Sequence, residues 1–281
     1  FGEIVASLTV EQLNGAAIAA GLEPETPGSL NVRIQASIGL EESDAMYSNT
    51  IRINVTPYQA FIPLAELFLV GDTTDHDWNN DNGNAPLFRD PANQFMYYYT
   101  GYFNVDGSGD DGFKLLTTLG SWHPQYGSVG EGLLGVSNAD GSNEAGAIAV
   151  PSSGYYTLTV DTENMTYSLV PFDASAAPNY STIGLIGSAT ASLTGGDGWA
   201  ADLNMTNTSN NPHLWRASDV VLSDGEAKFR EGDAWTNSWG NTTALSGQGN
   251  NNNDPNVPVF GGTYDIWFND LDGRYIFVPI N

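Results

Sequence analysis

The sequence has no cysteine and few basic residues. Its 281 residues include 33 acidic but only 8 basic side chains, which gives a formal net charge of -25. Without cysteine, disulfides, thiol catalysis and cysteine-ligated metals are excluded. Nucleic acid is not expected as a partner, because phosphate binding needs clustered Lys and Arg. No apolar run approaches the ~18 residues of a membrane span, so no transmembrane segment is expected.

The chain nevertheless has the composition of packed β-structure. It is 41% hydrophobic and 11% aromatic, with 32 glycines and 14 prolines. Short runs rich in β-branched and aromatic residues alternate with turn residues. Such runs occupy residues 31–38, 50–55, 154–160 and 263–268, and only residues 9–22 have the spacing of a helix. We therefore predict an all-β fold of tandem immunoglobulin-like β-sandwiches.

Three segments follow from the spacing of these runs. Residues 1–60 hold too few strands to bury both faces of a sheet, so we interpret them as the C-terminal half of an immunoglobulin or fibronectin type III-like sandwich, incomplete at its N-terminus. Residues 61–173 and 179–281 each have the length of a complete sandwich. A stretch of small residues, 173–178, predicts a linker between them.

The second and third segments are repeats of one another. Leu67–Thr74 matches Ile183–Thr190, and each is followed by a Trp, an aromatic strand, a Lys, a second Trp and a Gly-x-Tyr sequence. A shared order of landmarks is stronger evidence than any one of them. The matched residues are Trp78 and Trp199, Lys114 and Lys228, and Trp122 and Trp235.

The lysines point to a ligand. The chain has only two, Lys114 and Lys228, and they occupy matched positions between tryptophans. A sugar ring packs its C–H face on an aromatic ring, and its hydroxyls accept hydrogen bonds from a long donor. The candidate carbohydrate-binding residues are Trp78, Lys114, Trp122 and Tyr126 in the second segment, and Trp199, Lys228, Arg230, Trp235 and Trp239 in the third.

Each of these residues also has a purely structural interpretation. Tryptophans in sandwiches commonly pack in the core, and we assign Trp215 and Trp267 to the core or to a sheet face because they lie in strand patterns. A lysine in so acidic a chain finds a salt bridge easily. Trp122 and Trp235 lie in polar, glycine-flanked loops, where aromatic residues serve binding more often than packing.

Metal binding and catalysis have weaker signals. Residues 104–112 alternate oxygen ligands like a calcium loop but lack its final Glu, and a turn explains them better. Residues 75–83 and 250–254 also contain oxygen ligands without a defined spacing. No cofactor is therefore expected, with calcium as the alternative. The three histidines stand apart and no catalytic motif occurs, so we expect a protein that is not an enzyme.

The landmarks, in the order G-[DS]-[AT]-T, W, K, loop W and G-x-Y, resemble the SusE/SusF-type outer-membrane glycan-binding family. Residues 11–22 resemble the helix of its N-terminal domain, and residues 32–34 and 47–58 resemble the closing strands of that domain. The resemblance implies non-catalytic sandwiches that bind polysaccharide, with starch as the founding ligand, beside a SusC/SusD-like importer. It also implies a lipid anchor on the outer face of the outer membrane, expected in a part that precedes Phe1.

Two other functions stay open at this point. The same sandwiches serve as spacers or filament subunits in structural or adhesive surface proteins, and a partner strand would complete the first segment. A glycosidase needs only two facing carboxylates, which the 33 acidic residues supply without discriminating anything. Exposure of the loop tryptophans favours glycan binding over assembly.

Overall fold

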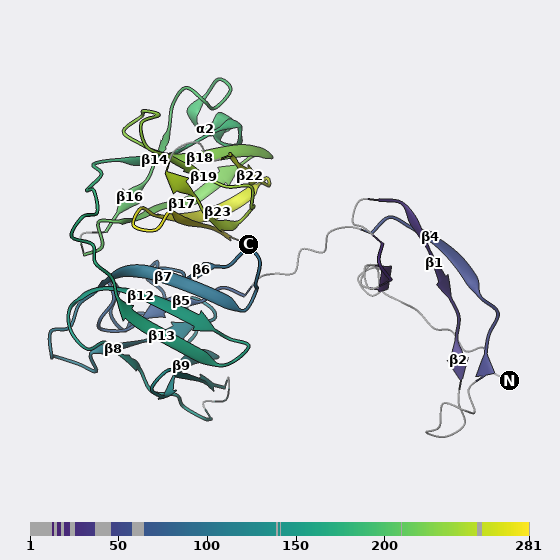
Figure 1. Cartoon of the computed structure of the whole chain (residues 1–281), viewed down its shortest axis with the longest axis horizontal. Coiled ribbons are helices and arrows are strands. Elements are labelled where there is room, and N and C mark those ends of the chain that lie inside the picture. Colours follow the sequence, from purple (N-terminus) through teal and green to yellow (C-terminus); the bar gives the residue numbers. More distant parts are fainter. Residues whose placement is uncertain are drawn as a thin grey trace. The chain divides into compact units, whose positions relative to one another are not determined.

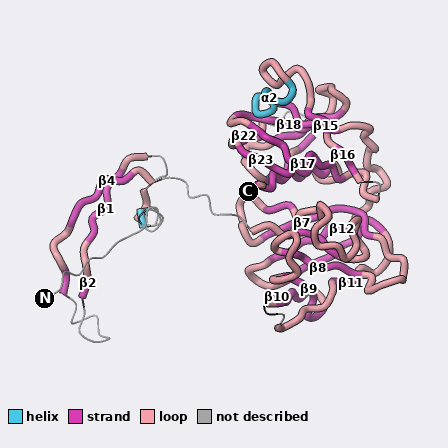
Figure 2. The backbone as a smooth tube through the Cα atoms, turned by 180° about the vertical axis from the view of Figure 1, so that it is seen from behind, coloured by secondary structure: helices cyan, strands magenta, loops and turns pink. Residues whose placement is uncertain are grey.

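The computed structural model describes residues 13, 16–17, 20–22, 26–36, 46–57, 65–138, 140, 142–208, 210–251 and 255–280. Two compact units divide the chain, Phe1–Leu64 and Ala65–Asn281. Figure 1 colours them along the sequence, and Figure 2 marks their strands and loops. The described residues are nearly all in strands, turns and loops, so the all-β prediction is confirmed. None of their helices is long and apolar enough to cross a membrane.

The described part of the first unit contains two antiparallel strand pairs. β1 (Gly28–Val32) pairs with β4 (Ile51–Val55), and β2 (Gln35–Ala36) pairs with β3 (Met46–Tyr47). Of the helix expected at residues 9–22, the structure describes a helical Leu13, Ala16 and Ala17 and a turn at Ala20 and Gly21. Residues 9–12, 14–15 and 18–19 lie outside the described residues.

The first sandwich of the second unit is one nine-stranded hydrogen-bonded sheet. Its order is β11-β8-β9-β10-β13-β12-β7-β6, and β5 pairs with β8. The strands are β5 (Phe68–Val70), β6 (Phe88–Arg89), β7 (Met96–Phe103), β8 (Gly112–Leu116), β9 (Gln125–Gly130), β10 (Leu133–Ser137), β11 (Ile148–Ala149), β12 (Gly154–Asp161) and β13 (Thr166–Pro171).

The second sandwich has two sheets, β15-β14-β18-β19-β21, to which β22 adds through β18, and β16-β17-β23-β24-β20. A short 3-10 turn, η2 (Ser188–Thr190), and helix α2 (Ala191–Thr194) follow its first strand. The strands are β14 (Ile183–Ile186), β15 (Leu203–Asn204), β16 (Thr206–Asn207), β17 (Leu214–Leu222), β18 (Gly225–Glu231), β19 (Ser238–Gly240), β20 (Ser246–Gln248), β21 (Asn250–Asn251), β22 (Val257–Val259), β23 (Gly262–Asn269) and β24 (Arg274–Pro279).

Each sandwich has its own hydrophobic core, and the two cores meet at β17, β23 and β24. In β23, Ile266 and Phe268 face the core of the second sandwich, whereas Trp267 packs with the core of the first. Side chains alternate between the two faces of a strand, so a strand buried on both faces is apolar throughout. Trp215 and Trp267 were expected in the core or on a sheet face, and both are buried in the core.

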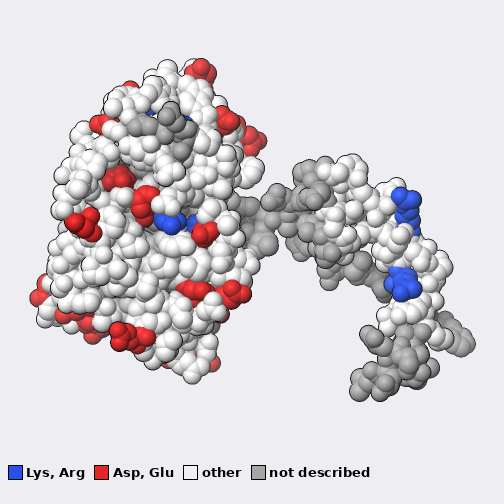
Figure 3. All heavy atoms as spheres, viewed as in Figure 1, with Lys and Arg blue, Asp and Glu red and all other residues white. Residues whose placement is uncertain are grey.

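Polar contacts also join the sandwiches. Asn269 Nδ2 donates to the carbonyl oxygen of Thr100 at 2.5 Å, and Asn211 Nδ2 donates to the Tyr99 hydroxyl at 2.9 Å. The Arg274 guanidinium lies 3.8 Å from the centre of the Tyr98 ring. These contacts join the two sandwiches, which belong to one compact unit. Figure 3 shows acidic side chains at many places on one face of this unit and few basic ones.

Candidate functional site

The Gly-Asp/Ser-x-Thr sequence forms the same turn in both sandwiches. Thr74 Oγ1 donates to the carbonyl oxygen of Gly71 at 2.7 Å, and Thr190 Oγ1 donates to that of Gly187 at 2.9 Å. A Cβ on Gly187 would lie 2.0 Å from the carbonyl oxygen of Glu226, so only glycine allows this close approach. The motif is therefore structural, and it fixes the start of the loop that carries the first tryptophan.

The first tryptophan of each repeat lies at an equivalent place. The Gly71 amide donates to the carbonyl oxygen of Asp77 at 2.9 Å, and the Gly187 amide donates to that of Gly198 at 3.0 Å. Asp77 and Gly198 both have positive φ and directly precede a tryptophan. These tryptophans are Trp78 and Trp199.

The two lysines also occupy the same register position. Lys114 in β8 lies opposite Val70 in β5, and Lys228 in β18 lies opposite Ile186 in β14. The sequence alignment of the lysines is thus reproduced by the strand pairing. Each lysine points away from the core, because its neighbours in the strand face the core.

The loop tryptophans complete the equivalence. Trp122 lies three residues before the start of β9, and Trp235 lies three residues before the start of β19. The first residue of β9 pairs with the residue two positions after Lys114 in β8, and the first residue of β19 pairs with the residue two positions after Lys228 in β18. The paired residues are Leu116 with Gln125, and Arg230 with Ser238.

In the first sandwich the predicted residues line one open hollow of about 420 Å³. Trp78, Lys114 and Trp122 contribute to its wall, and Trp122 is 40% exposed. The other lining residues are Asp110, His123, Gln125 and Glu144. The hollow therefore combines two indole rings with a row of polar groups.

Glu144 links the polar groups of this hollow. Its Oε1 accepts hydrogen bonds from Lys114 Nζ at 2.5 Å and from Gln125 Nε2 at 3.1 Å. Its Oε2 lies 3.1 Å from His123 Nε2. The bonds from Lys114 and His123 hold the pKa of Glu144 below its ordinary value, so the carboxylate is ionised at neutral pH.

The second sandwich presents an aromatic surface above a buried ion pair. The rings of Trp199 and Trp235 are 6.3 Å apart and inclined by 34°. The Arg230 guanidinium lies 4.6 Å from the Trp235 ring centre, and its Nη2 is 2.6 Å from Asp202 Oδ1. Arg230 and Asp202 are buried, so Arg230 supports Trp235 from below and does not extend to solvent.

Lys228 is mostly buried beside β19. Its side chain lies next to Gly240, where the position of an added Cβ would be 3.3 Å from Lys228 Cγ and Cε. Gly240 thereby leaves room for the aliphatic part of the lysine, and the residue as a whole is 9% exposed.

Two predicted residues lie on the other face of their strands. Tyr126 pairs with Leu115 and packs against the core of the first sandwich, half-buried. Trp239 pairs with Phe229 and is buried in the core of the second. Each faces the core because its cross-strand partner, the residue directly after the lysine, also faces the core. The structure therefore places neither beside the exposed tryptophans.

Sequence reasoning did not single out Glu144 or Asp202. Both come from loops about 30 residues from the basic side chain that they contact. Nothing local distinguishes them among 33 acidic residues. Among the residues that the structure describes, no three His, Asp or Glu side chains gather as a metal site would require. In the loop 104–112, Asp106 Oδ1 instead accepts a hydrogen bond from the backbone amide of Ser108 at 2.9 Å.

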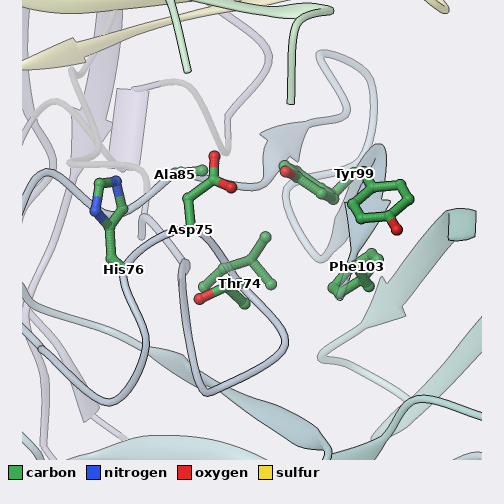
Figure 4. A pocket seen from close by; sticks show the side chains of 8 residues that line it. Thr74, Asp75, His76, Ala85, Tyr99 and Phe103 are labelled. Carbon is green, nitrogen blue, oxygen red and sulfur yellow. The ribbon is translucent and has the colours of Figure 1, made fainter. Parts of the chain in front are cut away.

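A second cavity is too small for a sugar. Asp75, His76 and Tyr99 lie around it, and its volume of about 10 Å³ suits one water molecule (Figure 4). Asp75 accepts a hydrogen bond from Thr208 of the other sandwich. Burial lowers the pKa of His76, so its ring is neutral at pH 7. This cavity belongs to the junction between the sandwiches.

Comparisons with known proteins find similarity among solved structures only. No protein-family model matches the sequence. No curated protein matches it either. Among solved structures, the chain is similar to SusF from Bacteroides thetaiotaomicron, with 16% sequence identity and a TM-score of 0.29. The match covers 96% of this chain and 62% of the SusF chain, so this chain spans less than two thirds of that protein.

Proposed function

We propose that the chain is a non-catalytic polysaccharide-binding protein with one site in each sandwich of the second unit. The site in the first sandwich, here called site A, consists of Trp78, Lys114 and Trp122. Site B in the second sandwich consists of Trp199, Lys228 and Trp235. The observation that carries the proposal is the equivalence of these residues in strand register, together with the exposure of both loop tryptophans.

Exposed indoles need a reason in a unit that buries many other aromatic side chains in its hydrophobic cores. Trp122 and Trp235 expose 40% and 52% of their surface, although burying such a ring contributes several kcal/mol. A rigid aromatic surface beside hydrogen-bonding groups is the requirement for stacking a sugar ring. Site B adds a preformed pair of rings, Trp199 and Trp235, which limits the entropy lost on binding.

Glu144 does not have the properties of the general acid of a glycosidase. A glycosidase needs a general acid with a raised pKa opposite a second carboxylate. The pKa of Glu144 is lowered instead, through its hydrogen bonds with Lys114 and His123, so it is a poor proton donor at neutral pH.

The proposed ligand is a neutral polymer, with an α-glucan such as starch as the first candidate from the sequence resemblance. Two sites on one chain raise avidity on a polymer that repeats its epitope. The same resemblance suggests a position on the cell surface, lipid-anchored in the outer membrane, beside SusC/SusD-like proteins. Extraction of the natural protein with the membrane fraction, and its co-purification with such proteins, test that part.

Calorimetry and affinity electrophoresis against a panel of polysaccharides test the binding itself. We expect Trp235→Ala with Lys228→Ala to abolish site B and to halve the measured stoichiometry. Phe260→Ala is the matched control, because Phe260 is an exposed aromatic residue of the same sandwich outside the site. Unchanged binding by the double variant would refute the site, and binding to no polysaccharide would refute the function.

A further inference from the structure

Glu144 has an unused hydrogen-bonding position that faces the hollow of site A. An ionised carboxylate accepts about two hydrogen bonds at each oxygen. Oε1 already accepts from Lys114 and Gln125, whereas Oε2 has His123 as its donor among the described residues. Because a carboxylate only accepts, His123 Nε2 carries the proton in that bond. One position on Oε2 is therefore free, on a side chain that is 50% exposed.

Lys114 has donors to spare at the same place. Its ammonium group carries three N–H donors, and its bond to Glu144 uses one of them. No other hydrogen bond of this group occurs within the part of the chain that the structure describes. Lys114 and Glu144 both line the hollow with Trp78 and Trp122. The spare donors of Lys114 and the spare acceptor position of Glu144 Oε2 thus belong to one hydrogen-bonded pair, which lines the hollow together with two indoles.

Two adjacent hydroxyls of a sugar ring complement such a pair. One hydroxyl accepts from the ammonium, and its neighbour donates to the carboxylate, while the ring packs on an indole. A ligand with its own negative charge is disfavoured, because Glu144 and Asp110 both line the hollow and the chain carries a net charge of -25.

Resting on the proposed function, we propose that the Lys114–Glu144 pair makes site A selective for neutral sugars with a free vicinal diol, and that it rejects carboxylated or sulfated glycans. Site B has a different polar part. Arg230 and Asp202 bond to each other and are buried, so they support the aromatic surface without touching a ligand. A change at Glu144 should therefore affect site A alone.

The experiment uses the full chain with site B disabled by Trp199→Ala and Trp235→Ala. Calorimetry measures its affinity for three probes: maltoheptaose, the same oligosaccharide methylated at O2 and O3, and the same oligosaccharide oxidised to carboxylates at C6. We expect binding of the first probe and at least about tenfold weaker binding of the other two, the size of one lost charge-assisted hydrogen bond. If maltoheptaose does not bind, another neutral polymer of the panel and its carboxylated form replace it.

In the same background, Glu144→Gln should weaken binding of the neutral probe about tenfold. It should also reduce the ratio of the affinity for the neutral probe to the affinity for the carboxylated probe. The change in this ratio separates recognition from a merely structural role. Glu163→Gln is the matched control, since it removes one exposed negative charge outside the hollow. Equal affinity for neutral and carboxylated probes, or a Glu144→Gln effect below twofold, would overturn the selectivity while leaving the sites standing. Binding that survives Trp78→Ala with Trp122→Ala would instead overturn the assignment of site A, and binding to no polysaccharide of the panel would overturn the proposed function.

Discussion

The ion pair beneath Trp235 offers a direct test of how site B is supported. Arg230 Nε lies 2.8 Å and 2.9 Å from the two carboxylate oxygens of Asp202, and Nη2 lies 2.6 Å from Oδ1. The two side chains are only 5% and 2% exposed. We predict that Asp202→Ala destabilises the fold strongly, because it leaves the Arg230 charge buried between β14 and β19 without its partner.

The expected loss of stability is large, but a second substitution, at Arg230, should recover most of it. Removing one partner of a buried ion pair costs about 3–5 kcal/mol. For a unit of this size, that corresponds to a fall of roughly 6–20 °C in melting temperature. Replacing both partners with leucine should restore most of the stability, because buried pairs are often matched by apolar residues. The first sandwich already has a buried leucine, Leu116, at the position of Arg230.

Urea unfolding followed by circular dichroism measures these changes. Glu144→Ala is the comparison, because it truncates the acidic partner of a pair whose carboxylate is half-exposed, and such pairs contribute only about 0–1 kcal/mol. A loss below about 1 kcal/mol for Asp202→Ala would refute the reasoning. So would a double leucine variant that is no more stable than Asp202→Ala alone.

Two further predictions concern the backbone and the pH dependence of stability. Gly187→Ala should cost about 2 kcal/mol or more in urea unfolding, because its Cβ would lie 2.0 Å from the Glu226 carbonyl oxygen and 2.6 Å from Ala227 Cα, both backbone atoms. The control is Gly154→Ala, whose Cβ would meet only the Tyr156 ring at an ordinary contact distance of 3.7 Å, and a cost for Gly187→Ala no larger than that of the control would contradict the reasoning. Burial raises the pKa of Asp270 from 3.8 to about 6, so the folded state resists losing this proton and its stability falls as the pH rises through that range. Asp270→Asn should therefore gain up to about 3 kcal/mol relative to the natural chain between pH 4 and pH 7, and a difference independent of pH would argue against it.

The repeat could be found from the sequence because its landmarks are set by local chemistry. Asp72 accepts hydrogen bonds from the amides of Asp110 and Gly112, and Ser188 accepts one from the amide of Glu226. A short side-chain acceptor is needed after the glycine in both turns, so the sequence conserves the order although the loops differ. The strand pattern and the buried tryptophans of β17 and β23 were predictable for the same reason, since each depends on a few adjacent residues.

The faces of the aromatic residues could not be predicted in the same way. Tyr126 and Trp239 follow loops, and a shift of one residue in strand register moves a side chain to the opposite face. The strand pairing assigns both to the core, whereas Trp122 and Trp235 lie before their strands and are exposed. Likewise, Glu144 enters its site from a distant loop, and only the folded chain brings it to Lys114.

The junction between the sandwiches bears on how the two proposed sites would work together. Trp267 of β23 is buried against the first sandwich, and Asn269 bonds to the backbone of Thr100. These contacts, and not the short stretch 173–178, determine the spacing of sites A and B. When the spacing of the two sites is fixed, binding at the second site adds to the overall affinity only if the ligand offers a second epitope at that distance. A polymer offers such epitopes along its length, whereas a short oligosaccharide does not, so the proposal requires avidity for long chains to exceed the affinity of either site for a fragment.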